Sequence, residues 1–176
     1  MDNYEAFLGI GSNVGNRIEN LSSALDMLAS NPDISIDIVS SLYVTSPVGM
    51  LEQPDFYNAA ALLHTTLPPE KLLDLCLRIE ASLGRQRTVH WGPRTIDIDI
   101  LLIKGVEMHT DSLIIPHPRI AERAFVLAPL AQIDPDLVLP NGIPVQRMYE
   151  SISGQSVKKL WESGWESKWR CSDMKQ

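Results

Sequence analysis

Hydrophobic positions in the first part of the chain follow two spacings, one typical of strands and one typical of helices. Residues 4–10 (YEAFLGI) predict a short strand, and the glycines and polar residues that follow predict a turn. A helix should come next, because apolar residues then recur at helical spacing until Asn31 and Pro32: Ile18, Leu21, Leu25 and Leu28. Residues 34–45 are rich in β-branched side chains and predict a second strand.

The next part of the chain continues this alternation after a Pro- and Gly-containing loop over residues 46–55. Residues 56–66 (FYNAAALLHTT) predict a third strand. A helix opened by two prolines follows, and its apolar residues form one stripe: Leu72, Leu75, Cys76, Ile79 and Leu83. Strict alternation over residues 95–103 (TIDIDILLI) predicts a fourth strand. This order is that of a split β-α-β fold, an α+β sandwich with helices on one face of an antiparallel sheet.

The rest of the chain contains more proline and is less regular. Residues 127–133 (LAPLAQI) suit either a helix or a strand, and residues 151–156 (SISGQS) predict a joint. We therefore expect one domain over residues 1–155 and a C-terminal tail over residues 156–176. Three tryptophans spaced four apart predict a docked amphipathic helix in the tail, although a glycine weakens it: Trp161, Trp165 and Trp169.

Composition and charge narrow the possible functions. The 176-residue chain has a formal net charge of −7 and a sequence pI of about 5.0, which disfavours nucleic-acid binding because phosphate contacts need a broad basic face. Cys76 and Cys171 have neither disulfide nor zinc spacing and suit a reducing compartment. No signal peptide can be recognised, and the apolar runs are too short to span a bilayer. We expect a cytoplasmic protein with small-molecule partners, no nucleic acid and no membrane.

The strand over residues 95–103 carries two acidic side chains two positions apart. Asp97 and Asp99 therefore project from one face, about 6.5–7 Å apart, while isoleucines project from the other. A divalent cation stabilises such a repelling pair, and carboxylate oxygens favour Mg²⁺, which takes its remaining ligands from water and substrate phosphates. Two ions about 3.5–4 Å apart would clamp an in-line phosphoryl transfer. A half-buried strand with a solvated polar face is the simpler alternative, and the neighbouring residues decide between the two.

The loop before this strand is basic, unlike the chain as a whole. Residues 84–94 (GRQRTVHWGPR) contain Arg85, Arg87 and Arg94 together with a histidine and no carboxylate. Guanidinium groups bind phosphate oxygens bidentately, so this loop beside an acidic metal pair predicts a triphosphate site. Trp91 is expected to stack on a flat ligand or to seal the closed loop. A solvated basic loop remains the alternative interpretation.

Two further segments carry candidate ligand contacts. On the strand over residues 56–66, Phe56 and Asn58 share a face, and Thr45 ends the preceding strand. An aromatic surface and polar groups would then meet a flat heteroaromatic ring. Residues 115–127 supply a further set: His117, Arg119, Arg123 and Phe125. A strand of mixed polarity and a structural histidine also explain these residues.

The N-terminal GIGSNVG is similar to a dinucleotide-binding fingerprint without matching it. The segment follows a strand and precedes a helix, but its G-x-G-x-x-x-G spacing is one residue too long, and strands and helices do not alternate downstream. We interpret it as a turn between strand and helix, with Asn or Ser capping the helix.

Four segments together resemble one enzyme family, in this order: LGIGSNVGN, YVTSPVGMLEQPDFYNA, GRQRTVHWGPRTIDIDILL and IIPHPRIAERAFVLAPL. The family is 6-hydroxymethyl-7,8-dihydropterin pyrophosphokinase of the folate pathway, and the resemblance covers about residues 4–140. WGPRTIDIDIL, PHPR and FVLAPL are its most specific parts. The resemblance implies a ferredoxin-like α+β monomer that uses two Mg²⁺ ions. It also implies transfer of pyrophosphate from ATP to the pterin, which yields AMP and the pterin pyrophosphate.

The resemblance further implies roles for individual residues. Asp97 and Asp99 would hold both magnesium ions and, with Arg85 and Arg94, form the catalytic set. The pterin would be bound at its edge and sandwiched between two phenylalanine rings by another set: Thr45, Val48, Phe56, Asn58 and Phe125. The residues that line or close the ATP site would be Glu80, Arg85, Arg87, Trp91, Arg94, His117 and Arg123.

Two alternatives stay open on the sequence alone. Another two-metal phosphotransferase or nucleotidyltransferase would share Asp97 and Asp99 but would not need Phe56, Asn58 and Phe125 as a ring site. A ferredoxin-like binding module for RNA or a regulatory ligand would need no catalysis. The negative charge and the lack of aromatic and basic residues interleaved on a strand face count against RNA. Mg²⁺-dependent AMP release only in the presence of hydroxymethyldihydropterin would separate the three.

Overall fold

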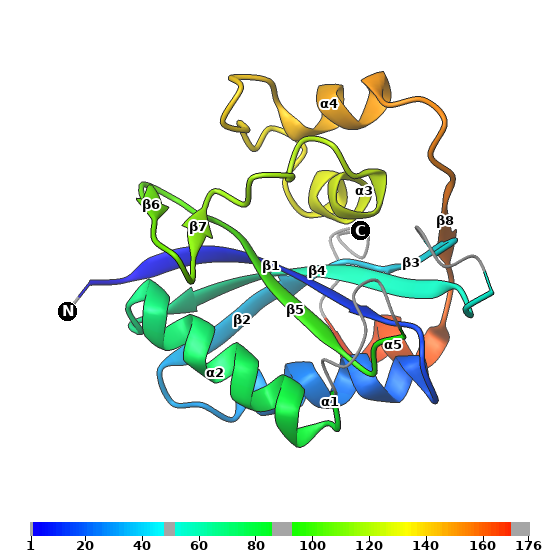
Figure 1. Cartoon of the computed structure of the whole chain (residues 1–176), viewed down its shortest axis with the longest axis horizontal. Coiled ribbons are helices and arrows are strands. Elements are labelled where there is room, and N and C mark those ends of the chain that lie inside the picture. Colours follow the sequence, from blue (N-terminus) through cyan, green and yellow to red (C-terminus); the bar gives the residue numbers. More distant parts are fainter. Residues whose placement is uncertain (1, 48–51, 86–92, 170–176) are drawn as a thin grey trace.

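The structure is a computed structural model that describes residues 2–47, 52–85 and 93–169. Its centre is an antiparallel sheet of strand order β5-β1-β4-β3-β8, in which β2 also pairs with β4 (Figure 1). The strands of this sheet are β1 (Tyr4–Ser12), β2 (Ile34–Val39), β3 (Leu42–Thr45), β4 (Phe56–Thr65), β5 (Asp97–Ile103) and β8 (Val157–Leu160).

Two helices connect the strands in the order that the sequence predicted. Helix α1 (Arg17–Ala29) joins β1 to β2, and α2 (Pro69–Ser82) lies between β4 and β5. Because β2 and β3 share one edge of β4 while β1 pairs with the other, this order produces the ferredoxin-like arrangement and confirms the α+β class. Asn16 caps α1, since its Oδ1 accepts the Glu19 N–H at 3.1 Å.

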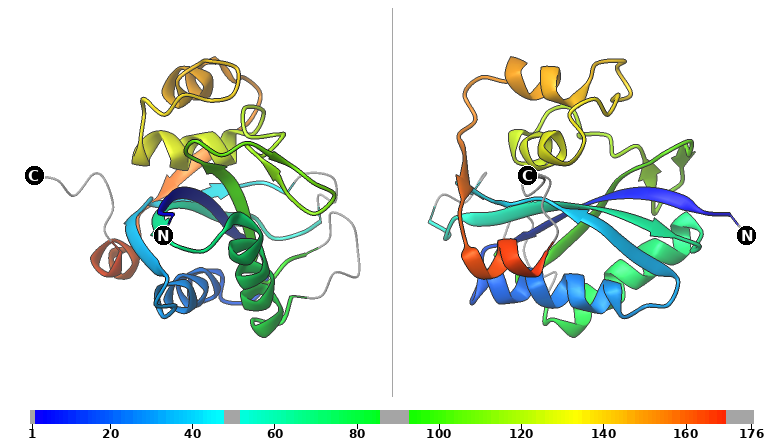
Figure 2. Two further views of the ribbon diagram at one scale, coloured as in Figure 1. Left: turned by 90° about the vertical axis from the view of Figure 1, so that its left-hand side faces the viewer. Right: turned by 180° about the vertical axis from the view of Figure 1, so that it is seen from behind.

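The sheet separates two cores, one on each face (Figures 1 and 2). Helices α1 and α2 pack on one face, where the buried cluster includes Ile10 and Ile98. Helix α3 (Ala124–Ile133) packs on the opposite face near Phe7, with α4 (Val145–Ser151) beyond it. The two helices of the split β-α-β unit therefore share one face, as expected, and α3 covers the other face. Helix α3 is apolar on almost every side, so it is buried between the sheet and α4.

The predicted strand over residues 34–45 is divided in two at a buried serine pair. Ser40 Oγ accepts the Ala60 N–H at 2.9 Å, so a side chain takes the place of a backbone partner. The Ser41 N–H donates to Gln132 Oε1 of α3 at 2.8 Å. This break lets β2 and β3 pair with different parts of β4.

The tail contains a strand as well as a helix. Strand β8 extends the sheet beyond β3, and the short helix α5 (Ser163–Lys168) lies beside α1 (Figure 1). Trp165 is only 2% exposed, and its indole N–H donates to the Ser40 carbonyl at 2.9 Å. Trp161 is 66% exposed. The expected common helix face for the tryptophans is therefore not formed, because the residues before α5 complete the sheet edge instead.

A short hairpin of β6 (Met108–His109) and β7 (Ile114–Ile115) precedes α3. The segment after it is tied to β5, since the His117 N–H donates to the Leu101 carbonyl at 2.8 Å. Among the described residues, no helix has the length and apolar character needed to span a bilayer.

Candidate active site

A pocket of about 500 Å³ opens on the face of the sheet that carries α3. Its lining includes residues of β1, β4 and β5 and the first turn of α3 with Phe125. Helix α3 covers only part of this face, and the pocket lies where that cover ends. The same strands that build the core on the opposite face therefore present their alternate side chains to an open cavity.

Two glycines of β1 form the floor of the pocket and leave space above it, because they have no side chains. Gly9 pairs with Asp99, and Gly11 pairs with Asp97. A Cβ added to Gly11 would lie 2.8 Å from Asn58 Oδ1, closer than side chains tolerate. We assigned both glycines to a turn, which was wrong, because β1 continues beyond them. Their spacing of two, typical of one strand face, is the signal that reveals this role.

One row of residues crosses the pocket floor from its acidic side to its aromatic side. Asp97 pairs with Gly11, and Gly11 pairs with Asn58 on the next strand. Because neighbouring strands are about 4.8 Å apart, the backbones of Asp97 and Asn58 are roughly 10 Å apart. A phosphate chain bound at one end of this row can therefore meet a ring bound at the other end, above the glycine.

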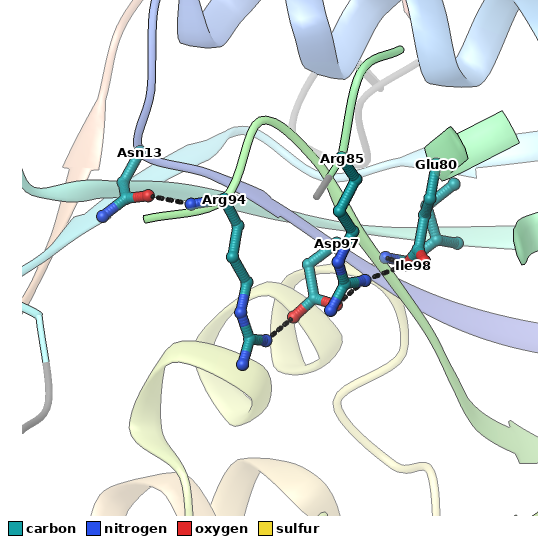
Figure 3. A network of polar contacts seen from close by, with 6 residues as sticks. All are labelled: Asn13, Glu80, Arg85, Arg94, Asp97 and Ile98. Carbon is teal, nitrogen blue, oxygen red and sulfur yellow. Dashed lines mark hydrogen bonds and ion pairs between the residues drawn. The ribbon is translucent and has the colours of Figure 1, made fainter. Parts of the chain in front are cut away.

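Asp97 is held by two arginines that precede β5. Arg85 Nη1 lies 2.8 Å from Asp97 Oδ1, and Arg94 Nη1 lies 2.7 Å from Asp97 Oδ2. Figure 3 shows the two guanidinium groups reaching the carboxylate from different sides. Arg94 lines the pocket, whereas the more deeply buried Arg85 reaches Asp97 from the end of α2. Three of the four predicted catalytic side chains are thus in direct contact.

Glu80 supports this arrangement from the core. Its side chain is buried in α2, and its Oε1 pairs with Arg85 Nη1 at 2.5 Å and accepts the Ile98 N–H at 2.8 Å (Figure 3). We predicted Glu80 as an ATP contact, but it is 2% exposed and does not line the pocket. A buried carboxylate is stable when it is paired and hydrogen-bonded, so we interpret Glu80 as a support for Arg85 and β5.

Asp99 lies beside Asp97 on the same face of β5 and also lines the pocket. Burial, followed by the negative charge of Asp97, raises the pKa of Asp99 to about 7. Within the described ranges, no group of three or more His, Cys, Asp and Glu side chains is arranged to hold a metal ion. The two carboxylates nevertheless fit Mg²⁺, which commonly takes one or two protein carboxylates and completes its shell with water and phosphate oxygens.

Asn13, just after β1, joins segments on two sides of the site. Its Oδ1 accepts the Arg94 N–H at 2.8 Å, and its own N–H donates to the Arg94 carbonyl at 3.1 Å (Figure 3). Its Nδ2 donates to Gln53 Oε1 at 3.1 Å and to the Pro54 carbonyl at 3.2 Å. Asn13 therefore fixes the backbone that carries Arg94. We did not predict this role, because its partners are 40 to 81 residues away along the chain.

The aromatic side of the pocket contains a buried polar pair. Asn58 Nδ2 donates to Thr45 Oγ1 at 2.9 Å, and both side chains are buried. This bond orients the amide so that Asn58 Oδ1 lies over Gly11. Phe56 and Phe125 line the same pocket, so the structure brings these four predicted residues together.

Cationic side chains lie near the first turn of α3. Arg119 and Arg123 line the pocket, and Arg123 Cζ lies 5.6 Å from the centroid of the Phe125 ring. His117 does not line it. Its Nδ1 accepts the Arg119 N–H at 3.1 Å, and burial, followed by the charge of Arg123, lowers the pKa of His117. Both effects favour the neutral imidazole, and the hydrogen bond accepted at Nδ1 favours the form protonated at Nε2.

The remaining predicted ligand contacts lie outside the described residues: Val48, Arg87 and Trp91. The pocket thus contains the described part of the predicted pterin set and both predicted metal ligands. From the predicted ATP set it contains Arg94 and Arg123, whereas Glu80, Arg85 and His117 are not among its lining residues.

The sequence matches the family model described as 7,8-dihydro-6-hydroxymethylpterin-pyrophosphokinase (HPPK) over residues 7–135. The 2-amino-4-hydroxy-6-hydroxymethyldihydropteridine pyrophosphokinase of Methylorubrum extorquens is 48% identical over 155 residues, which cover 88% of this chain and 98% of that protein. The Bacillus subtilis protein of the same name is 47% identical over 131 residues, which cover 74% of this chain and 78% of that protein.

Solved structures agree on the fold. The crystal structure of Plasmodium falciparum HPPK-DHPS, wild type with pteroate, aligns with a TM-score of 0.66 and 17% sequence identity. The alignment covers 85% of this chain but only 42% of that one, so this chain spans less than half of its structural neighbour. At this identity the likeness supports the fold alone. The family match and the close relatives go further, and the chain belongs to the 7,8-dihydro-6-hydroxymethylpterin-pyrophosphokinase family.

Proposed function

We propose that this chain transfers the pyrophosphoryl group of ATP to the hydroxymethyl group of 6-hydroxymethyl-7,8-dihydropterin in folate biosynthesis and releases AMP. The observation that carries the proposal is a single pocket with two different sides. One side has Asp97 and Asp99 next to Arg94, and the other has Asn58 together with Phe56 and Phe125. The first suits a magnesium-bound polyphosphate, and the second suits a flat ring with a polar edge.

At the phosphate side, the chain supplies two ligands and the groups that neutralise charge. Asp97 and Asp99 would hold two Mg²⁺ ions, which would supply positive charge to the phosphate oxygens during transfer. In the structure described here, Arg85 and Arg94 pair with Asp97. When Asp97 serves a cation instead, the Arg94 guanidinium is released toward the pocket, where it is suited to bind phosphate oxygens bidentately.

At the pterin side, the chain supplies hydrogen-bonding groups and ring surfaces. Asn58 Oδ1 faces the floor above Gly11 and would accept hydrogen bonds from ring N–H groups. Thr45 Oγ1 already accepts from Asn58, so its hydroxyl hydrogen is available to donate. Phe56 and Phe125 would stack on the two ring faces.

The transfer itself needs position and electrostatic support more than covalent chemistry by the protein. The pterin hydroxyl oxygen would attack the β-phosphorus in line, the bond from that phosphorus to the α-phosphate oxygen would break, and AMP would leave. Arg94 would stabilise the charge that develops on the transferred group. Arg123, which lines the pocket beside Phe125, would hold the remaining phosphate oxygens.

The proposal is tested by separating the products of a reaction with ATP, Mg²⁺ and 6-hydroxymethyl-7,8-dihydropterin. We expect AMP and the pterin pyrophosphate in equal amounts, and no AMP when the pterin is omitted or Mg²⁺ is chelated. The Asp99→Asn variant should form neither product. ADP as the nucleotide product would contradict pyrophosphoryl transfer and indicate a phosphotransferase that uses the same carboxylates.

We further propose that the enzyme acts as a monomer, because one chain contains the metal ligands and the ring site in one pocket. Light scattering should give the mass of one chain, 19.6 kDa, with and without substrates. A dimer mass at the protein concentrations used for the assay would contradict this proposal.

A further inference from the structure

One glutamine from the end of the chain binds the loop that carries the aromatic wall of the pocket. The Gln155 side-chain amide donates from Nε2 to the Glu122 carbonyl at 2.9 Å and accepts at Oε1 from the Ala124 N–H at 2.9 Å. The two partners flank Arg123. The amide thus pairs with two alternate backbone groups, as a neighbouring strand would, and it fixes the backbone between them.

Gln155 bonds to the start of α3, which has no side-chain cap of its own. Arg123 is the N-cap residue of α3, has extended backbone angles (φ −115°, ψ 113°), and makes no side-chain capping hydrogen bond. The first N–H groups of a helix need partners from outside the helix. Gln155 provides one of them. Gln155 lies 31 residues further along the chain, and the N–H that it accepts belongs to Ala124, the residue before Phe125.

The position of Gln155 links two walls of the pocket. Gly154 before it has a positive φ of 77°, which forms the turn that leads the chain from α4 toward the sheet edge (Figure 1). Two residues after Gln155, Val157 begins β8 and pairs with Thr45. Gln155 also lines the pocket itself. Residues 155–157 therefore connect the start of α3 with the strand that carries the Asn58 partner, Thr45.

We infer that Gln155 is a positioning residue for pterin binding: it holds the start of α3 so that Phe125 covers the ring site. The inference rests on the proposed function, because it assigns Phe125 to the pterin. Both polar ends of the amide are used by the backbone, so its effect on the ligand is exerted through Phe125 and Arg123. The segment that leads into β8 thereby belongs to the substrate site.

The test compares Gln155→Ala with Gln146→Ala by calorimetric titration of the pterin in the presence of Mg²⁺ and a non-hydrolysable ATP analogue. Gln146 is a matched control, because it is a partly exposed glutamine in α4 whose side chain donates to Glu150 Oε1 at 2.6 Å, and it does not line the pocket. Loss of two backbone hydrogen bonds should weaken pterin binding about tenfold in Gln155→Ala. Gln146→Ala should bind as the wild type does.

A second variant and a kinetic readout distinguish positioning from a purely structural role. Gln155→Glu keeps an acceptor for the Ala124 N–H but places a carboxylate against the Glu122 carbonyl, so its pterin affinity should be no better than that of Gln155→Ala. In both variants we expect the KM for the pterin to rise more than the KM for ATP, because the bonded backbone groups adjoin Phe125 and flank Arg123, with a thermal midpoint close to wild type. Pterin affinity equal to wild type in Gln155→Ala, with or without a lower midpoint, would overturn the inference. Absence of pterin binding by the wild type would instead overturn the proposed function.

Discussion

The two faces of the central sheet are made by the same strands, yet one face is closed and the other opens into the pocket. On β1, Leu8 and Ile10 point into the core beneath α1 and α2, while Gly9 and Gly11 lie on the pocket floor. Strand β5 follows the same alternation, with Ile98 and Ile100 on the core face and the two aspartates on the pocket face. A change of one position along a strand therefore moves a residue from the stabilising face to the functional face.

This contrast teaches that stability and chemistry are largely carried by different side chains of the same elements. The core face consists of buried aliphatic residues whose loss leaves cavities. The pocket face combines glycines, carboxylates and an amide that contribute little apolar burial. Substitutions on the pocket face should therefore impair catalysis without unfolding the protein, and substitutions on the core face should do the reverse.

The largest effect is expected for Asp97→Asn on the pocket face. The variant loses a metal ligand and the anionic partner of Arg94, so turnover should fall by at least about a thousandfold. The fold should persist, since Glu80 still pairs with Arg85 in the core. AMP formation and circular dichroism measured on the same sample check both expectations.

The control for this variant is Asp74→Asn. Asp74 lies on the exposed side of α2, where its Oδ2 is 3.9 Å from Lys71 Nζ in a weak surface pair. It should keep wild-type turnover. If the turnover of Asp97→Asn were within tenfold of that of Asp74→Asn, Asp97 could not be an essential metal ligand.

On the core face, Leu25→Ala should lower the free energy of unfolding by about 2–5 kcal/mol, because the side chain is fully buried in α1. Activity per folded molecule should stay close to wild type, since α1 does not line the pocket. Urea unfolding and the assay at low temperature measure the two quantities. Leu77→Ala, at a position 38% exposed on α2, is the matched control with a much smaller loss. A large loss of kcat in folded Leu25→Ala would show that the faces are not separable.

Gly11→Ala tests whether the space above the pocket floor is needed for pterin binding. The added Cβ would lie 2.8 Å from Asn58 Oδ1, so the amide has to shift from its position above the glycine. Pterin affinity should fall about tenfold to a hundredfold. Calorimetric titration with the ATP analogue present measures it. The control is Gly164→Ala, where nothing lies within 4 Å of the new methyl group. Equal pterin affinity in the two variants would show that Asn58 does not contact the ring.

The smallest expected effect is the rate at which a reagent labels the buried thiol of Cys76, which measures how often the core face opens. Burial raises the pKa of Cys76 to about 12, so its thiolate fraction at pH 8 is roughly a thousandfold below that of an ordinary thiol with a pKa of 9.0. In a Cys171→Ser background, a thiol reagent should label Cys76 only after denaturant is added. Fast labelling of the native variant would show that this face opens readily.

Local patterns predicted the elements that position the two pocket aspartates, Asp97 and Asp99. The alternation around Asp97 and Asp99 predicted β5 and its polar face, and the apolar stripe after two prolines predicted α2. These features depend on neighbours within a few residues, so the sequence alone contains them. The roles of individual ligands came from the family resemblance rather than from spacing.

The remaining features depend on partners far along the chain. The break between β2 and β3 requires Gln132, 91 residues from Ser41, and the cap of α3 requires Gln155. The pocket role of Gly11 becomes visible only when Asn58 lies on the neighbouring strand. The support that Glu80 gives to β5 was missed for the same reason, since helical spacing does not show that its carboxylate accepts the Ile98 N–H. Such tertiary contacts override local propensity.

The most direct test of the account is a crystal structure with Mg²⁺, a non-hydrolysable ATP analogue and 6-hydroxymethyl-7,8-dihydropterin. We expect metal ions bound by both Asp97 and Asp99, the Arg94 guanidinium on phosphate oxygens, and the pterin ring between Phe56 and Phe125. A nucleotide bound away from β5, with both carboxylates free of metal, would contradict the assignment of this face as the active site.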